Sequence, residues 1–329
     1  MILIVMLQPL GRGQLVPNLG GQRAGISALQ FLKIGVGGRG SALGEAFVAI
    51  SNDVSSLYWN PAGLTQFEEN AVYVSHTNWL VDIRHQFLGV GYHLGHDDHI
   101  GLSITSLHMD DMEVTTETQP LGTGRYFKFG DLAVGLSYAR RMTDQFSFGV
   151  TAKYVEETLD VLKMRGVLFD LGTYYWTGIG SMRFAVVVSN FGGNVEPNGS
   201  VTLLSGEKRE TFQSFSPPTL FKIGFAAEVI ESDEHRLTTT MQLNHPNDNA
   251  ENIRIGGEYE WNKLLALRAG VKRTIGAPLF GADNTGESDI SLGLGIAVPV
   301  SEMHVIFDYA YSNFNRLGGV HRFSLGLTY

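Results

Sequence analysis

Residues 131–140 read DLAVGLSYAR, and large apolar side chains alternate strictly with small or polar ones along this stretch. Strict alternation places the two sets on opposite faces of a β-strand. The bulky face carries Leu132, Val134, Leu136 and Tyr138, and the other face carries Ala133, Gly135, Ser137 and Ala139. The stretch therefore predicts a strand with one strongly apolar face and one face of small side chains.

The same period of two continues from residue 71 to residue 329. In residues 145–154, 290–298 and 322–329 one face is again bulky and apolar, while the other holds mainly Gly, Ser, Thr and charged residues. A transmembrane β-barrel needs this arrangement, because its bulky face meets lipid and its polar face lines the lumen. We therefore predict an all-β fold, a closed antiparallel barrel of about fourteen strands. The strands are expected near residues 71–78, 85–94, 99–107, 131–140, 145–157, 164–177, 181–190, 218–229, 235–244, 252–260, 263–272, 289–298, 302–311 and 320–329.

The connections between these strands support a membrane barrel over a soluble sandwich. Every second connection is short, and those between are longer, notably residues 108–130, 191–217 and 273–288. Outer-membrane barrels have short periplasmic turns and longer extracellular loops. An even number of strands places both termini in the periplasm. Because the pattern is that of an outer-membrane barrel, we expect the protein in the outer membrane of a Gram-negative bacterium, in contact with its lipid.

Composition excludes several other classes of protein. The chain of 329 residues has no cysteine, which removes disulfides, thiolate metal sites and cysteine nucleophiles. Its formal net charge is −9 and the acidic residues are dispersed, which argues against a nucleic-acid-binding surface. No apolar run approaches the roughly 18 residues of a transmembrane helix.

Residues 1–13 are interpreted as a signal peptide. Residues 1–10 form a short, mostly apolar run, and Gly11-Arg12-Gly13 fits a cleavage site with small residues. The basic residues that usually precede the apolar part of a signal peptide are missing here. A start codon assigned too far downstream would explain their absence. The alternative is a buried N-terminal strand.

Residues 14–70 do not alternate and are expected to form a hatch or plug for the barrel of residues 71–329. A helix is predicted over residues 41–50, with Leu43, Ala46, Phe47 and Ile50 on one stripe. A second short helix should run through Leu57 and Trp59 and stop before Pro61, because the residue before a proline is forced out of the helical region. Such a segment fits inside the lumen or across the periplasmic mouth.

Several motifs make a family resemblance specific. They are FLKIGVGGRG at residues 31–40, GEAFVA at 44–49, YWNPAGL at 58–64, HPNDN at 245–249 and LRAG at 267–270. The chain resembles the PorV/PorQ family, whose barrels are related to the FadL long-chain fatty-acid transporters. The resemblance implies a FadL-like barrel of fourteen strands and assigns the hatch motif to Asn60, Pro61 and Ala62.

The resemblance also implies a role in type IX protein secretion or surface attachment. Partners would be the type IX translocon, the attachment complex or cargo proteins, bound through the loops at residues 108–130 and 191–217. The second loop ends in candidate contact residues, Phe212, Phe215, Pro217 and Pro218. The alternative interpretation of this second loop is that it simply folds over the barrel mouth. The alternative function is FadL-like transport of hydrophobic small molecules.

Charged residues are predicted on the lumen face, where we interpret them as structural ion pairs rather than a substrate path. They are Lys153, Asp170, Arg183, Lys222, Glu228, Arg254, Glu258, Arg268, Lys272, Asp308 and Arg322. The chain ends on alternating apolar residues with a terminal aromatic, which resembles the signal read by the barrel-assembly machinery. This predicted signal consists of Phe323, Leu325, Leu327 and Tyr329.

No pattern in the sequence indicates catalysis, a cofactor or a metal, so we expect a protein that is not an enzyme. Gly35, Gly37 and Gly40 match a dinucleotide motif, but no βαβ unit follows them. The histidines at 93, 96 and 99 are assigned to a solvated turn, and the acidic residues near 110 to a loop. The three glycines are interpreted as allowing tight packing in the barrel mouth.

Overall fold

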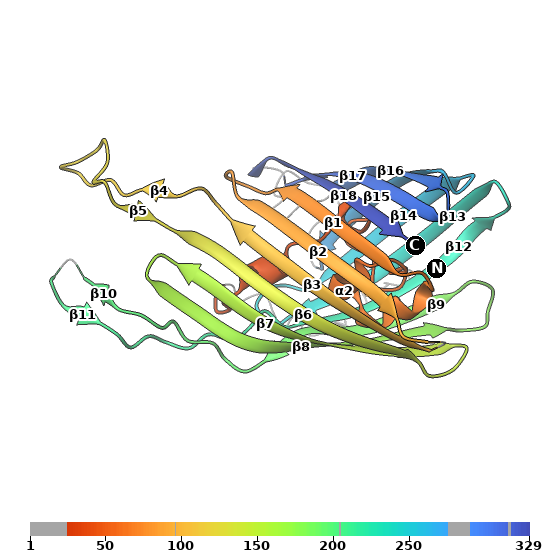
Figure 1. Ribbon diagram of the computed structural model, residues 1–329, viewed down its shortest axis with the longest axis horizontal. Helices are drawn as coiled ribbons and strands as arrows, with labels where there is room; N and C mark the ends of the chain where they lie inside the picture. Colours follow the sequence, from red (N-terminus) through yellow and green to blue (C-terminus); the bar gives the residue numbers. More distant parts are fainter. Residues whose placement is uncertain (1–24, 96, 204, 276–289, 315–316) are drawn as a thin grey trace, which may run out of the picture.

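The computed structural model describes residues 25–95, 97–203, 205–275, 290–314 and 317–329. Fourteen strands form a closed antiparallel barrel in the order β1-β18-β17-β16-β15-β14-β13-β12-β9-β8-β7-β6-β3-β2 (Figure 1). The predicted fold class is therefore confirmed. The strands of the barrel are β1 Ala71–Asn78, β2 Arg84–His93, β3 Asp98–His108, β6 Phe129–Arg141, β7 Phe146–Leu159, β8 Leu162–Trp176, β9 Arg183–Gly192, β12 Leu220–Glu231, β13 His235–Pro246, β14 Asn252–Trp261, β15 Leu265–Thr274, β16 Ile290–Val300, β17 Met303–Asn313 and β18 Gly319–Thr328.

The last strand closes the barrel onto the first. β1 pairs with β18 along its whole length, from Ala71 opposite Thr328 to Asn78 opposite His321. The backbone N–H of Tyr329 then donates to the carbonyl oxygen of Asn70, at 2.9 Å. Closure leaves no unpaired edge strand in the barrel, as an apolar surrounding requires.

The two faces of the wall are oriented as the alternation predicts. Leu136 on β6 and Leu294 on β16 point outward and are 63% and 54% exposed. On the lumen side, Ala139 of β6 and Arg322 of β18 are 0% and 1% exposed. Bulky apolar residues thus cover the outside of the wall, the reverse of a soluble sandwich.

The two ends of the barrel differ, and we name them the loop end and the turn end. The loop end carries two ribbons, β4 Met112–Glu113 with β5 Tyr126–Phe127, and β10 Val201–Thr202 with β11 Lys208–Arg209. Figure 1 shows both ribbons projecting far beyond the barrel on the same side. The turn end carries short turns and the C-terminal residue Tyr329.

The predicted rhythm of short and long connections holds only in part. The loop-end connections 79–83 and 247–251 have five residues each, whereas 177–182 at the turn end has six. Two residues, 160 and 161, join β7 to β8 at the loop end, where a longer connection was expected. The reason is that β7 and β8 continue as strands of 14 and 15 residues, so the hairpin itself extends outward. The long connections at 109–128 and 193–219 agree with prediction, and most of the predicted loop at 273–288 lies outside the described residues.

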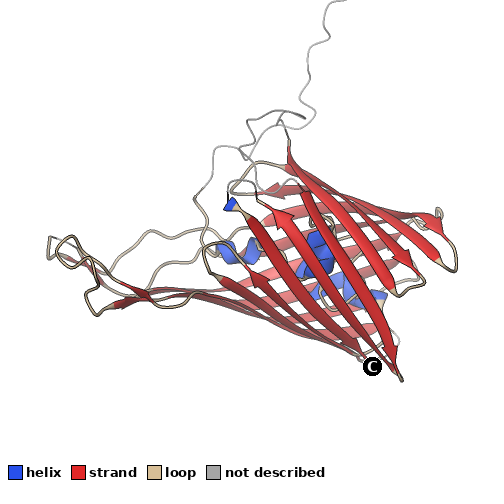
Figure 2. Ribbon diagram, turned by 90° about the horizontal axis from the view of Figure 1, so that it is seen from above, coloured by secondary structure: helices blue, strands red, loops and turns tan. Residues whose placement is uncertain are grey.

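The N-terminal segment enters the lumen, where Figure 2 shows its helices enclosed by the strands. Its elements are η1 Gln30–Lys33, α1 Gly38–Ala42, α2 Ser56–Trp59 and η2 Pro61–Gln66. The helix predicted over residues 41–50 is wrong, because α1 ends at Ala42 and the chain turns through Gly44 and Glu45, both at φ 63°. The predicted break before Pro61 is present, with Asn60 extended at φ −161°. The predicted signal peptide lies outside the described residues.

Among the described residues, no helix is both long and apolar enough to cross a membrane.

The outward orientation of Leu294 gives a test of the wall. Leu294→Arg should destabilise the barrel by about 2–4 kcal/mol, because a cation on the lipid face loses its hydration. Gly326→Ser, on the lumen face of β18, is the matched control: the nearest atom to its new Cβ would be in the Tyr73 ring at 3.6 Å. Unfolding in lipid vesicles measures both variants, and equal destabilisation would contradict the orientation.

Candidate functional site

The hatch is the N-terminal segment of residues 25–70, and its backbone lies directly against glycines of the barrel wall. A Cβ on Gly270 of β15 would lie 2.0 Å from the backbone of Leu43 and Gly44. A Cβ on Gly149 of β7 would lie 2.4 Å from the backbone of Pro61 and Ala62. Any side chain at these wall positions would displace the hatch. A Cβ on Gly256 would also meet hatch backbone, at 2.7 Å, and hatch side chains approach within 2.2 to 2.5 Å of the same position at Gly101, Gly172, Gly224 and Gly293.

Asn60 of the predicted hatch motif connects the hatch to the wall. Its Nδ2 donates to the carbonyl oxygens of Val48 and Thr173, at 2.9 and 3.1 Å, and Thr173 belongs to β8. Its Oδ1 accepts from the backbone N–H of Ala62 at 3.1 Å, which caps η2. Asn60 is fully buried, and Pro61 occupies the first position of η2. The motif is therefore built as an anchor of the hatch.

A buried charge network holds the hatch from the other side. Arg39 donates from Nε and Nη2 to the two carboxylate oxygens of Glu258, both at 2.8 Å. Arg268 donates to Glu258 at 2.5 Å and to Asp308 at 2.6 Å. Burial alone would lower the pKa of Arg39, but Glu258 and Asp53 raise it well above its ordinary value. The network therefore keeps a charged hatch residue bound to strands β14, β15 and β17.

The remaining predicted lumen charges also face inward. Five of them form three ion pairs on the wall or with the hatch: Lys153–Asp170 at 2.8 Å, Arg183–Glu228 at 2.7 Å and Arg254–Glu45 at 2.5 Å. Lys222 lies over the Tyr58 ring at 5.9 Å. Arg322 lies under the Trp79 ring at 5.6 Å and donates to Ser312 at 2.9 Å. Lys272 lines the space beside Glu45 and Arg254.

The ion pair Lys153–Asp170 coincides with an irregularity in the wall. The register of β8 and β9 shifts between Phe169 and Leu171, and Asn190 there adopts a left-handed conformation at φ 59°. The carboxylate of Asp170 accepts from the backbone N–H of Asn190 at 2.7 Å, and Lys153 donates to the Asn190 side chain at 2.5 Å. These side chains replace the ladder hydrogen bonds that the bulge interrupts.

The candidate partner residues of the second loop are not the exposed ones. The backbone of Phe215 pairs with that of Val195, and its ring packs against a buried apolar cluster that includes Leu29 and Leu168. Pro217 and Pro218 are buried. Phe212 is half-buried. Phe215, Pro217 and Pro218 therefore lie at the base of the loop on the barrel mouth, which agrees with the alternative interpretation of this loop.

Exposed apolar residues of the loop end include Val81, Val161 and Leu317 on its shorter connections, and three more lie in the first loop. Leu121, Met112 and Tyr126 are 97%, 57% and 55% exposed, and the last two belong to the β4–β5 ribbon. The sequence pattern does not single them out, because no alternation marks this short ribbon and its exposure depends on how far the loop projects.

The terminal residues of the predicted assembly signal lie on β18 and just after it. Phe323 and Leu325 face outward and are 38% and 49% exposed, and Tyr329 is 55% exposed at the turn end. Leu327 is half-buried on the same outward face. His93 ends β2 and His99 lies in β3, where the two rings stack at 4.4 Å. His99 is 2% exposed, so its assignment to a solvated turn is wrong, because strand pairing places it on the buried face. Among the described residues, no group of His, Asp or Glu is arranged to hold a metal ion.

The fold is shared with solved transporter structures. The toluene transporter TbuX of Ralstonia pickettii has a TM-score of 0.58 and 12% identity, over 90% of this chain and 97% of that chain. A FadL homologue of Pseudomonas aeruginosa has a TM-score of 0.57 and 13% identity, over 89% and 98%. At this identity the similarity establishes the fold alone. The protein is thus a FadL-like barrel of the outer-membrane type, closed by an N-terminal hatch.

The family follows from the sequence profile described as Type IX secretion system protein PorV, which matches residues 19–245. This match covers more than half of the chain, and the protein belongs to the PorV family. The comparison with curated proteins gives no match.

The contact between hatch and wall can be tested at Gly270. Gly270→Ala should displace the hatch, because its new Cβ meets backbone atoms that cannot rotate away, and overpacking of this kind costs about 1–3 kcal/mol. Gly257→Ala on the neighbouring strand is the control, since its Cβ would meet nothing within 4 Å. Limited proteolysis of residues 25–70 in the assembled barrel is the measurement. Equal protection of the hatch from the protease in both variants would contradict the close contact between its backbone and Gly270.

The charge network gives a second prediction. Glu258→Gln should destabilise the protein by about 3–5 kcal/mol, because it leaves the guanidinium groups of Arg39 and Arg268 without their shared buried carboxylate. Glu156→Gln, which removes a carboxylate from the outer face of β7, should cost under about 1 kcal/mol. Thermal unfolding in detergent compares the two. A small effect for Glu258→Gln would mean that the network does not hold the hatch.

Proposed function

We propose that this protein is a non-enzymatic barrel of the outer membrane of a diderm bacterium that binds protein partners at its loop end. In this role it takes part in type IX protein secretion or in surface attachment. Membership of the PorV family supports the secretion role. The barrel-assembly machinery is the proposed partner during insertion, through the outward-facing Phe323 and the terminal Tyr329.

The observation that carries the proposal is the pair of ribbons that extends beyond the barrel at the loop end. Exposed apolar side chains that cluster on a protein surface mark interaction sites. Met112, Leu121 and Tyr126 lie in the loop that carries the β4–β5 ribbon. A ribbon of two strands also has free backbone edges, to which an extended segment of a partner can add as a further strand.

The contacts that hold the hatch in the lumen favour partner binding over transport. At the level of the hatch, several glycines of the described wall lie in contact with hatch atoms. Arg39 of the hatch pairs with Glu258 of the wall, and Arg268 pairs with Asp308 on the wall. A hydrophobic substrate would have to displace Asn60 from two carbonyl oxygens and Arg39 from Glu258. The transporters of the same fold are about 12 to 13% identical to this chain. Transport of hydrophobic small molecules is the alternative function.

Substitution of the exposed residues tests the proposal directly. In a triple variant, Met112→Asp, Leu121→Asp and Tyr126→Asp, translocon or cargo proteins should co-purify at least about tenfold less, because hot-spot residues contribute about 2 kcal/mol or more each. Ile179→Asp is the matched control, since Ile179 is 71% exposed at the turn end. Co-purification from solubilised membranes, with heat-modifiable gel mobility as the assembly check, gives the result.

Two outcomes would contradict the proposal. One is that the triple variant assembles and retains all partners. The other is that Asn60→Ala impairs uptake of a hydrophobic molecule while partner binding stays intact, which would favour transport.

A further inference from the structure

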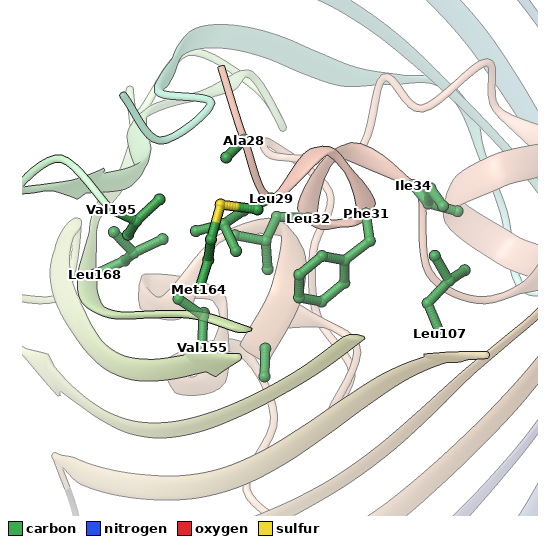
Figure 3. Close-up of a cluster of buried hydrophobic side chains, with 11 residues drawn as sticks. Ala28, Leu29, Phe31, Leu32, Ile34, Leu107, Val155, Met164, Leu168 and Val195 are labelled. Atoms are coloured by element: carbon green, nitrogen blue, oxygen red, sulfur yellow. The ribbon is translucent and has the colours of Figure 1, made fainter. Parts of the chain in front are cut away.

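A cavity of about 590 Å³ lies at the loop end of the lumen, between the hatch and the wall. Its apolar lining comes from Phe31 and Ile34 of the hatch, from Leu107 and Phe129 of the wall, and from Trp79 after β1. Figure 3 shows Phe31 and Ile34 lying opposite Leu107. The volume and the apolar lining are those of a small-molecule site.

Two carboxylates line the same cavity. Asp131 of β6 and Glu157 of β7 are direct neighbours across the strand pair, and both face the lumen. Asp131 is 5% exposed, and its Oδ1 is buried without a hydrogen-bond partner. Glu157 accepts a hydrogen bond from the backbone N–H of Leu29 at 2.7 Å. A buried, unpartnered acceptor beside a second carboxylate indicates a missing donor.

Basic side chains do not supply that donor. Among the described residues, neither Asp131 nor Glu157 lies within ion-pair distance of a Lys, Arg or His. Lys33 also lines the cavity but forms an ion pair with Asp248 at 3.0 Å. Lys272 belongs to β15, seven strands away from β6 in a barrel of fourteen, and so lies on the opposite wall. Two carboxylates that face each other across strands repel when both are ionised, and a cation between them would remove this repulsion.

We propose that this cavity binds an amphiphilic amine. Its ammonium group would lie between Asp131 and Glu157, and its apolar body would lie along Phe31, Leu107 and Phe129. The inference is independent of the proposed partner binding, which uses the ribbons outside the barrel.

Ligand selectivity of the unaltered full-length protein is the first test. Octylamine, octanol and octanoate have the same alkyl chain and differ in head group, so calorimetry in phosphatidylcholine nanodiscs compares the head groups directly, with empty discs as the blank. Octylamine should bind at least about tenfold more tightly than octanol, since a hydrogen bond to a charged group contributes that much. Octanoate should bind more weakly still. Octanol or octanoate binding as tightly as octylamine would overturn the proposal.

Substitution of the two carboxylates is the second test. Asp131→Asn with Glu157→Gln keeps the side-chain shapes and the acceptor for Leu29, and should remove the preference for octylamine over octanol. Glu156→Gln is the control, because Glu156 pairs with Lys163 and Arg165 on the outer face and does not line the cavity. A preference for octylamine that survives the double substitution would overturn the proposal. If the double variant does not assemble, the head-group selectivity of the unaltered protein decides whether the proposal stands.

Discussion

Direct contact between the hatch backbone and the lumen glycines is the constraint on which the rest of the structure depends. Gly149 and Gly270 lie at wall positions where the main chain of residues 43–44 and 61–62 takes the place of a side chain. A wall of fourteen strands encloses more space than its own small inward side chains fill. The hatch therefore completes the core of this barrel, and the wall has glycine where the hatch touches it.

Enclosure by the hatch also explains why many of the lumen charges are paired. A charge removed from water is costly unless an opposite charge and hydrogen bonds replace the water. Glu258 satisfies Arg39 of the hatch and Arg268 of the wall, and Arg254 meets Glu45 in the same way. Because these pairs join hatch to wall, the polar lumen fixes the position of the hatch instead of forming a path for ions. Binding chemistry is then left to the loop end, with its ribbons and its acidic cavity.

Much of the wall could be predicted because its physical cause is local. Alternation in residues 131–140 predicts which side chains face lipid, and this prediction does not depend on the position of any other strand. The break at Pro61 is equally local, since proline restricts the residue before it. The helix expected over residues 41–50 failed because its apolar stripe, with Leu43 and Phe47, packs against the wall from a turn. Tertiary contacts outweighed the weak helical preference of so short a segment.

The loop end depends on contacts between distant residues, and there prediction was weakest. Phe215 looks exposed in sequence but packs near the hatch, whereas Leu121 is exposed only because its loop projects beyond the barrel. Asp131 and Glu157 lie 26 positions apart and meet through strand register. The sequence by itself determined the barrel, its approximate strand number and the orientation of the wall residues in its alternating stretches, because period two is a property of each strand. Only the tertiary structure decided which charges pair, where the hatch sits and which loop residues stay exposed, because those depend on distances between segments that sequence order does not contain.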